Sequence, residues 1–275
     1  MPTFVIIGAM KCGTTSLHYY LGMHPEIGMS KNKELAFFPE RFNWKRGERW
    51  YRRQFDPSKP VRGEASPHYS CYPHHPNVPA RMHALLPEAK LIYLVRDPVE
   101  RIVSHYCHDV ARGFEHEPFA EAVLAPDSKY LMRSQYHRQI ERYLPYYDPE
   151  AILVVDQADL RERRRETLAR VFTFVGADPD VWDVRFHLER HRTERKRRRT
   201  PAGERLAETL PMRALRTLPV RLRWPLEDLV YYPFSRPMER PEVDPALHAA
   251  IADRLGDDVA RWRAFTGRDF AHWSL

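Results

Sequence analysis

The sequence predicts an α/β fold in which helices cover both faces of a central parallel sheet. Three apolar runs have the length of buried strands, namely Phe4–Ile7, Leu91–Val95 and Ala151–Val155. Their apolar residues are continuous rather than alternating, which is typical of strands buried on both faces. Stretches with helical patterning separate the runs, so we interpret them as consecutive βαβ units, which build parallel sheets.

Helices between and after these strands follow from periodicity and from capping residues. The clearest is predicted over 161–175, where apolar residues form one stripe and Gly176 provides a C-terminal stop. Pro98 suits the first turn of another helix, because its missing N–H has no partner there in any case. Shorter helices are predicted over 79–86, 98–106 and 134–143.

The chain has 275 residues, of which 43% are apolar, and this is enough for one substantial core. We expect a single domain over 1–275, with a core over about 3–200 and a helical, proline-punctuated part over 201–275. In the latter part, four aromatic residues are expected to pack together: Trp224, Tyr231, Tyr232 and Phe234.

No apolar run approaches the roughly 20 residues that a membrane-spanning helix needs. The N-terminus has no basic segment, and its apolar stretch is too short for a signal peptide, so we expect a cytoplasmic protein. Three scattered cysteines, Cys12, Cys71 and Cys107, do not indicate a disulfide framework or a zinc site, and no metal is expected. The net charge of +7 suits a polyanionic ligand and equally nucleic acid.

The first strand leads through a glycine turn into a helix that begins with hydroxyl side chains. Gly8 ends the apolar run, Lys11 and Gly13 lie in the turn, and the helix starts at Thr14-Thr15-Ser16. Free N–H groups and the helix dipole favour an anion at such a terminus, and lysine adds a charge. The sequence therefore predicts a phosphate- or sulfate-binding loop. The alternative is an ordinary threonine cap, which needs one hydroxyl and no lysine.

The order of residues in this loop differs from that of nucleotide triphosphatases. Their pattern is G-x-x-x-x-G-K-[ST], with the lysine after the second glycine. Here Lys11 precedes Gly13.

A second anion-binding arrangement is predicted at the end of the strand Leu91–Val95. Arg96-Asp97-Pro98 follows this strand directly, and Ser104 lies two turns into the next helix. In open α/β sheets ligands bind at the carboxyl ends of the strands, where Arg96 and Ser104 would both grip a phosphate. The alternative is a surface pair between Arg96 and Asp97 with an incidental serine.

The two arrangements together resemble the paired motifs of sulfotransferases that use 3′-phosphoadenosine 5′-phosphosulfate (PAPS). The resemblance rests on Gly8-x-x-Lys11-x-Gly13-Thr14-Thr15 and on the strand followed by Arg96-Asp97-Pro98 and Ser104, and it covers roughly residues 3–200. It is strongest to the heparan-sulfate-type and related bacterial O-sulfotransferases. The resemblance implies a P-loop-like sheet, PAPS as cofactor with PAP as its product, and in-line sulfuryl transfer to a hydroxyl of a small molecule, lipid or saccharide.

The resemblance also implies which residues hold the cofactor. The 5′-phosphosulfate would be bound by the loop residues Lys11, Cys12, Gly13, Thr14, Thr15 and Ser16, and the 3′-phosphate by Arg96 and Ser104. Cys12 has a second interpretation as a small packing residue. A basic loop that closes over the cofactor in these enzymes would correspond to Arg195, Lys196 and Arg197, which match it in position but not in its glycine-containing sequence.

Candidate catalytic residues follow from the same resemblance. Glu34, which precedes the pair Phe37-Phe38, matches the glutamate that acts as base, although Ala36 stands where a polar residue is common. Lys11 would neutralise the leaving phosphate. Glu64 matches a second acidic position that would orient the acceptor or Lys11. His68 and His105 are rival bases, because histidine titrates near neutral pH.

Two other classes of protein remain as alternatives. A P-loop kinase or nucleotide triphosphatase would need Mg²⁺ and a carboxylate at the end of another strand, and Asp156 has such a position. A nucleic-acid-binding protein would use the basic run over 190–199, which is otherwise a solvated charge run.

Overall fold

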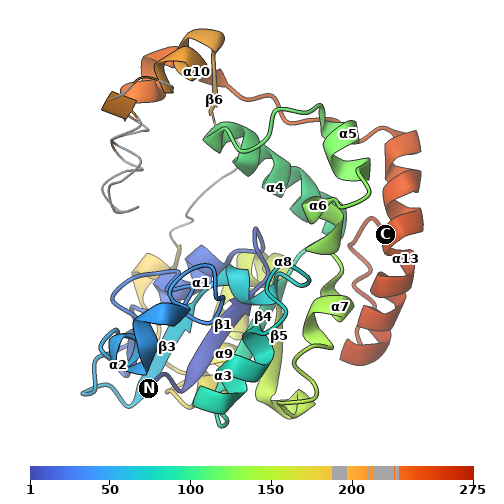
Figure 1. Cartoon of the computed structure of the whole chain (residues 1–275). Coiled ribbons are helices and arrows are strands. Elements are labelled where there is room, and N and C mark those ends of the chain that lie inside the picture. The colour runs from blue at the N-terminus through green and yellow to red at the C-terminus, as the bar shows by residue number, and fades with distance from the viewer. Residues whose placement is uncertain (188–196, 208, 210, 213–225, 227–228) are drawn as a thin grey trace.

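Five parallel strands form the central sheet of the computed structural model, which describes residues 1–187, 197–207, 209, 211–212, 226 and 229–275 (Figure 1). The strand order is β2-β3-β1-β4-β5. All neighbouring pairs are parallel. The strands are β1 Phe4–Gly8, β2 Ile27–Met29, β3 Val61–Ala65, β4 Lys90–Val95 and β5 Ile152–Asp156.

The topology places the predicted anion loop at a switch point. The chain leaves β1 towards the β2 edge of the sheet, whereas β4 lies on the other side of β1. The carboxyl end of β1 therefore lies between connections that run in opposite directions, which is where ligands bind in open α/β sheets. Every residue of β1 is buried, as are all residues of β4 except Lys90.

Helices lie on both sides of this sheet. Because β1 leads to β2 and β3 leads to β4 in opposite directions, right-handed crossovers place the intervening helices α1 and α3 on opposite faces. The helix α13 packs against α5, α6 and α7 (Figure 1). The helices are α1 Thr14–Leu21, α2 Gly47–Arg52, α3 Val78–Leu85, α4 Pro98–Arg112, α5 Phe119–Leu124, α6 Lys129–Met132, α7 Tyr136–Ile140, α8 Gln157–Glu162, α9 Arg164–Val175, α10 Pro201–Ala207 and α13 Pro245–Thr266.

The helix α4 shows how local sequence fixes an element next to the site. Asp97 caps it by accepting a hydrogen bond from the Glu100 N–H at 2.8 Å, and Pro98 occupies its first turn. Gly113 ends the helix in the left-handed conformation that glycine adopts without strain. The helix begins directly after Arg96, so the cap fixes where that arginine leaves the sheet.

The structure confirms the three predicted buried strands as β1, β4 and β5 and adds β2 and β3. The helix predicted over 161–175 is interrupted at Arg163, which separates α8 from α9. The helix predicted over 134–143 is shorter, because α7 covers only Tyr136–Ile140. No helix within the described ranges is long and apolar enough to cross a membrane.

The expected aromatic cluster near residue 230 does not form as predicted. Tyr232 is 62% exposed, and Tyr231 instead packs with Ala207 and Met212 in a small second cluster. Trp224 lies outside the described residues.

The short strand β6, Arg197–Arg199, pairs with β7, Ser235–Pro237, in a separate antiparallel ribbon.

A glycine in β3 makes the sheet sensitive to one added methyl group. A Cβ at Gly63 would lie 2.0 Å from the ring of Phe4, which is fully buried. We expect Gly63→Ala to lower the free energy of unfolding by about 1–3 kcal/mol through overpacking. The matched control is Gly256→Ala in α13, where nothing lies within 4 Å. That variant should gain about 0.5–1 kcal/mol because alanine favours the helix. Urea titration measures both, and equal midpoints would contradict this packing.

Candidate functional site

The loop after β1 is held in a shape that directs backbone N–H groups outward. Gly8 has no room for a side chain, since a Cβ there would lie 1.9 Å from the Ser70 hydroxyl oxygen. Lys11 and Gly13 have φ of 73° and 94°, so both lie in the left-handed region. The Ala9 N–H donates to the Leu94 carbonyl at 2.7 Å and ties the loop to β4.

This loop and the start of α1 have unused hydrogen-bond donors. The first turn of α1 carries no side-chain cap. Within the described part of the chain, no acceptor lies within hydrogen-bond distance of the Lys11 and Gly13 N–H groups. A helix N-terminus with free donors in such a turn is an anion cradle, as the sequence predicts.

The Lys11 ammonium group is half-buried, and no carboxylate of the described residues pairs with it. Burial lowers the pKa of Lys11, while the charges of Glu34 and Asp109 act in the opposite direction. An ammonium removed from water without a partner is costly, and a bound sulfate or phosphate would remove that cost. Arg96 also acts on Lys11 through its charge, so the structure brings these two predicted residues together.

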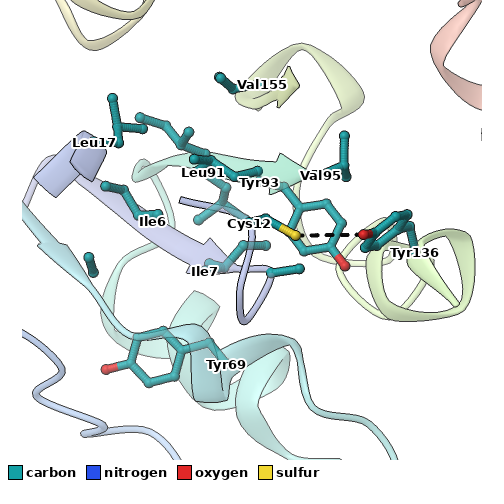
Figure 2. Close-up of a cluster of buried hydrophobic side chains, with 14 of the residues drawn as sticks. Ile6, Ile7, Cys12, Leu17, Tyr69, Leu91, Tyr93, Val95, Tyr136 and Val155 are labelled. Atoms are coloured by element: carbon teal, nitrogen blue, oxygen red, sulfur yellow. Dashed lines mark hydrogen bonds between the residues drawn. The ribbon is translucent and has the colours of Figure 1, made fainter. Parts of the chain in front are cut away.

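Cys12 points away from the mouth of the loop into the core (Figure 2). Its Sγ lies 3.6 Å from the Tyr136 hydroxyl, and the side chain is fully buried. Burial raises the pKa of the Cys12 thiol to about 11. The side chain therefore packs in the core beneath the cradle, and only the backbone of Cys12 is left to contribute to the loop. The Tyr136 hydroxyl also donates to the Arg96 carbonyl at 2.7 Å and joins the two motifs.

The segment that carries Glu34 has an unusual backbone. Glu34 and Ala36 have φ of 62° and 43°, a region that non-glycine residues seldom occupy. Hydrogen bonds to the end of β3 hold it there: the Glu34 N–H donates to the Ala65 carbonyl at 2.9 Å, and the Ala36 N–H donates to the Ser66 hydroxyl at 2.9 Å. Strained backbone that is fixed in this way is frequent at active sites.

The Glu34 carboxylate forms an ion pair with Lys33 and is 39% exposed. Burial acts against ionisation, but the charge and hydrogen bond of Lys33 and the charges of His68 and Lys11 hold the pKa of Glu34 below its usual value. Glu34 is therefore ionised near neutral pH. Lys33 is a contact that the sequence did not reveal, and it supplies a polar partner that Ala36 cannot.

Glu64 lies beneath this segment rather than in it. Its side chain is fully buried and accepts hydrogen bonds from the Tyr51, Tyr69 and Ser66 hydroxyls. The Tyr69 hydroxyl in turn accepts the Phe37 N–H at 2.9 Å. Burial raises the pKa of the Glu64 carboxyl to about 7, despite these hydrogen bonds. Glu64 thus orients the Ser66 and Tyr69 hydroxyls, and these accept hydrogen bonds from the segment that carries Glu34. The contacts of Glu64 do not include Lys11.

At the end of β4, Arg96 contacts a carboxylate of the protein itself. Its guanidinium donates to Glu100 at 2.7 Å, and Glu100 also pairs with Arg240. Ser104 is buried one turn further along α4. A phosphate that binds Arg96 bidentately would replace Glu100.

Comparison with known proteins agrees with this geometry. Residues 1–204 match the model of the sulfotransferase domain family. The chain belongs to the sulfotransferase family. This confirms the resemblance drawn from the sequence, and with it the fold and PAPS as the cofactor.

Individual relatives show how far the similarity extends. The chain is 29% identical over 205 residues to the human bifunctional heparan sulfate N-deacetylase/N-sulfotransferase 2, which is 65% of this chain and 22% of that protein. It is 40% identical over 111 residues to the membrane-associated sulfotransferase kil1 of Dictyostelium discoideum, which is 38% of this chain and 22% of that protein. The chain thus spans about a fifth of the length of these curated relatives. The crystal structure of a sulfotransferase from Alicyclobacillus acidocaldarius superposes with a TM-score of 0.70 at 25% identity, covering 100% of this chain and 99% of that one.

The basic segment is placed only in part. Arg195 and Lys196 lie outside the described residues. Arg197 lies in β6, which packs next to α4. Its guanidinium donates to the Ser235 hydroxyl at 2.8 Å and lies 4.4 Å from the centre of the Tyr232 ring. Arg197 thus contacts β7 and Tyr232 before it. Closure of the basic segment over the cofactor stays a prediction.

The two rival histidines differ in position. His68 interacts electrostatically with Glu34 and lies next to the site. His105 is 1% exposed between the guanidinium groups of Arg101 and Arg133, and burial lowers its pKa well below the usual value. This burial contradicts His105 as a candidate base. Arg133 itself was not found from the sequence, because it belongs to no motif.

Glu64 provides a pH-dependent test of the buried hydroxyl cluster. Its pKa rises from 4.5 to about 7 on folding, so between these values the unfolded chain is ionised and the folded chain is not. The folded state then binds the extra proton, and its stability falls as the pH rises. We expect the unfolding free energy of the wild type, relative to Glu64→Gln, to decrease from about pH 4.5 to about 7 and then to level off. A flat curve over this range would contradict the burial of Glu64 in the cluster.

Proposed function

We propose that the protein transfers the sulfuryl group of PAPS to a hydroxyl group of a small-molecule, lipid or saccharide acceptor. The observation that carries this proposal is Lys11, a half-buried ammonium without an ion-pair partner in the described part of the chain, which lies in a cradle of free N–H groups. Glu34, an ionised carboxylate, interacts with it from the adjoining segment. A cationic cradle beside a carboxylate base suits transfer of an anionic group to a hydroxyl.

The proposed reaction is an in-line displacement at sulfur. The acceptor oxygen forms a bond to sulfur while the bond from sulfur to the phosphate oxygen breaks, and PAP leaves. Lys11 and the N–H groups of the loop stabilise the charge that grows on the departing phosphate oxygen. Glu34 takes the acceptor proton, with Lys33 holding the carboxylate in place. Arg96 and Ser104 would bind the 3′-phosphate after Glu100 has released Arg96.

The kinase or triphosphatase alternative has less support. Asp156 ends β5, which is separated from β1 by β4. Its carboxylate accepts the Ala158 N–H at 2.9 Å as a helix cap and lies 3.0 Å from His272. Asp156 therefore already serves as a helix cap and has a histidine partner. The nucleic-acid alternative depends on the basic run over 190–199, of which 190–196 lie outside the described residues. The cytoplasmic location also stays a prediction.

Removal of the loop ammonium tests the cofactor site. We expect Lys11→Ala to weaken PAP binding roughly tenfold or more, since hydrogen bonds to charged groups contribute about 1.5–3 kcal/mol. Cys12→Ala is the matched control, because its side chain packs beneath the loop, and it should keep the wild-type affinity. Calorimetric titration with PAP measures both. An unchanged dissociation constant in Lys11→Ala would remove the loop from the cofactor site.

The reaction itself is tested by incubation with PAPS and a panel of hydroxyl and amine acceptors, with mass detection of the product. We expect an 80-dalton gain on a hydroxyl acceptor, the mass of SO3, and no loss of rate with EDTA.

Glu34→Gln should keep PAP affinity and lose roughly 10²–10⁴-fold in turnover, because the base is absent. Gains on amines alone would overturn the acceptor class, strict dependence on Mg²⁺ would favour the kinase alternative, and full turnover in Glu34→Gln would exclude Glu34 as base.

A further inference from the structure

Three rings form a cluster on the side of Glu34 that faces the β3–α3 connection. The Phe42 ring centre lies 5.0 Å from that of His68 and 5.6 Å from that of His75, and the two imidazoles are 6.3 Å apart. Phe42 is 42% exposed, which is unusual for so large an apolar side chain next to a polar site. His68 connects the cluster to Glu34 through their electrostatic interaction.

The backbone around the cluster is ordered by local hydrogen bonds. The Phe42 N–H donates to the Pro39 carbonyl at 3.1 Å, and the His75 N–H donates to the Cys71 carbonyl at 3.2 Å. Burial lowers the pKa of His68 and lowers that of His75 to about 4. Both imidazoles are thus uncharged near neutral pH. Uncharged aromatic rings with an exposed face form a platform for the flat face of a ligand ring.

Arg133 contacts the anion loop and acts through its charge on the histidines of the ring cluster. Its guanidinium approaches the Met10 sulfur at 3.4 Å, one residue before Lys11. Its charge also lowers the pKa values of His68, His74 and His75, so all three lie within its field. A cation therefore lies against the anion loop, and its charge reaches the histidines of the ring cluster.

The partners of Arg133 do not neutralise it. No carboxylate of the described residues lies within ion-pair distance of its guanidinium, and its buried Nε has no acceptor there. Its other contact is the His105 ring nitrogen at 3.3 Å. Arg101 approaches the second nitrogen of the same ring at 3.4 Å, and a neutral imidazole accepts only one hydrogen bond. Since Arg101 also has Ser134 and the Tyr130 carbonyl, Arg133 is the arginine with spare donors.

We propose that Phe42, His68, His75 and Arg133 form the acceptor subsite and that it takes a cyclic acceptor carrying an anionic group such as a carboxylate. The ring of the acceptor lies on the aromatic cluster, the anionic group binds the Arg133 guanidinium, and the hydroxyl faces Glu34 and Lys11. This inference rests on the proposed function, because it names the acceptor class of the same reaction. A charged pair between guanidinium and carboxylate in a half-buried position supplies both affinity and orientation.

The test uses matched acids and neutral analogues on two kinds of ring. The probes are 4-hydroxybenzoate against 4-hydroxybenzamide, and methyl glucuronide against methyl glucoside. Each is titrated calorimetrically into protein saturated with PAP. We expect the acid of at least one pair to bind roughly ten- to a hundredfold more tightly than its neutral partner. The pair that binds identifies whether the platform takes an aromatic or a sugar ring.

Variants separate the roles of charge and ring. Arg133→Gln should bring the acid-to-neutral ratio to within about twofold while PAP affinity stays unchanged, whereas Arg133→Lys should keep part of the preference. Arg142→Gln, on the surface beside Tyr72, is the matched control and should keep the full ratio. Phe42→Ala should weaken the acid and the neutral probe alike. This variant serves if Arg133→Gln does not fold.

The outcomes distinguish a failure of the acceptor subsite from a failure of the proposed sulfotransferase reaction. Equal binding of acids and neutral analogues, absence of binding by all four probes, or a preference that survives in Arg133→Gln would overturn the subsite. If PAP binds and PAPS is consumed in those cases, the proposed sulfotransferase reaction stands without it. If PAP does not bind, the proposed function fails first.

Discussion

Parallel pairing of β1 with both β3 and β4 is the constraint from which the site follows. This pairing brings three strand ends to one edge of the sheet, and each end delivers a different part of the site. The end of β1 becomes the anion loop, the end of β4 presents Arg96, and the end of β3 anchors the Glu34 segment through Ala65 and Ser66. A slip of one residue in either pairing would turn Arg96 or the anchor to the other face.

The second requirement is rigidity in a segment that has no regular secondary structure. Glu34 and Ala36 adopt left-handed backbone that nothing in their side chains favours. A fully buried carboxylate, Glu64, orders hydroxyls that accept the N–H groups of this segment. The cost of burying a carboxyl is offset by three hydrogen bonds and by protonation near pH 7, which keeps the cluster neutral. The candidate base thus depends on residues that never contact a substrate.

The sequence predicted the sheet, the anion loop and the arginine at the end of the strand Lys90–Val95, because these depend on short local patterns. Apolar runs mark strands, and glycine with lysine and hydroxyls marks a phosphate turn. It did not reveal Lys33 as the partner of Glu34 or Arg133 as an unpaired cation, because such contacts depend on distant segments meeting. His105 illustrates the converse error, since the residue type suits a base but the fold encloses it between two arginines. Glu64 was expected to orient the acceptor or Lys11, whereas its hydrogen bonds go to three hydroxyls of the protein, and this burial could not be read from neighbouring residues.

The ion pairs around Glu100 have a consequence for how the nucleotide end of the site behaves in salt. Glu100 bridges Arg96 and Arg240, so the protein holds an internal anion where a phosphate would bind. Ionic strength then acts on two competing interactions, because salt screens the internal pair as well as the attraction to the phosphate. If Arg96 binds the 3′-phosphate, the two effects would partly cancel, and nucleotide affinity would depend less steeply on ionic strength than the number of cationic side chains alone suggests. The same pair would make the position selective, since a ligand would have to bind Arg96 better than a carboxylate does in order to displace Glu100.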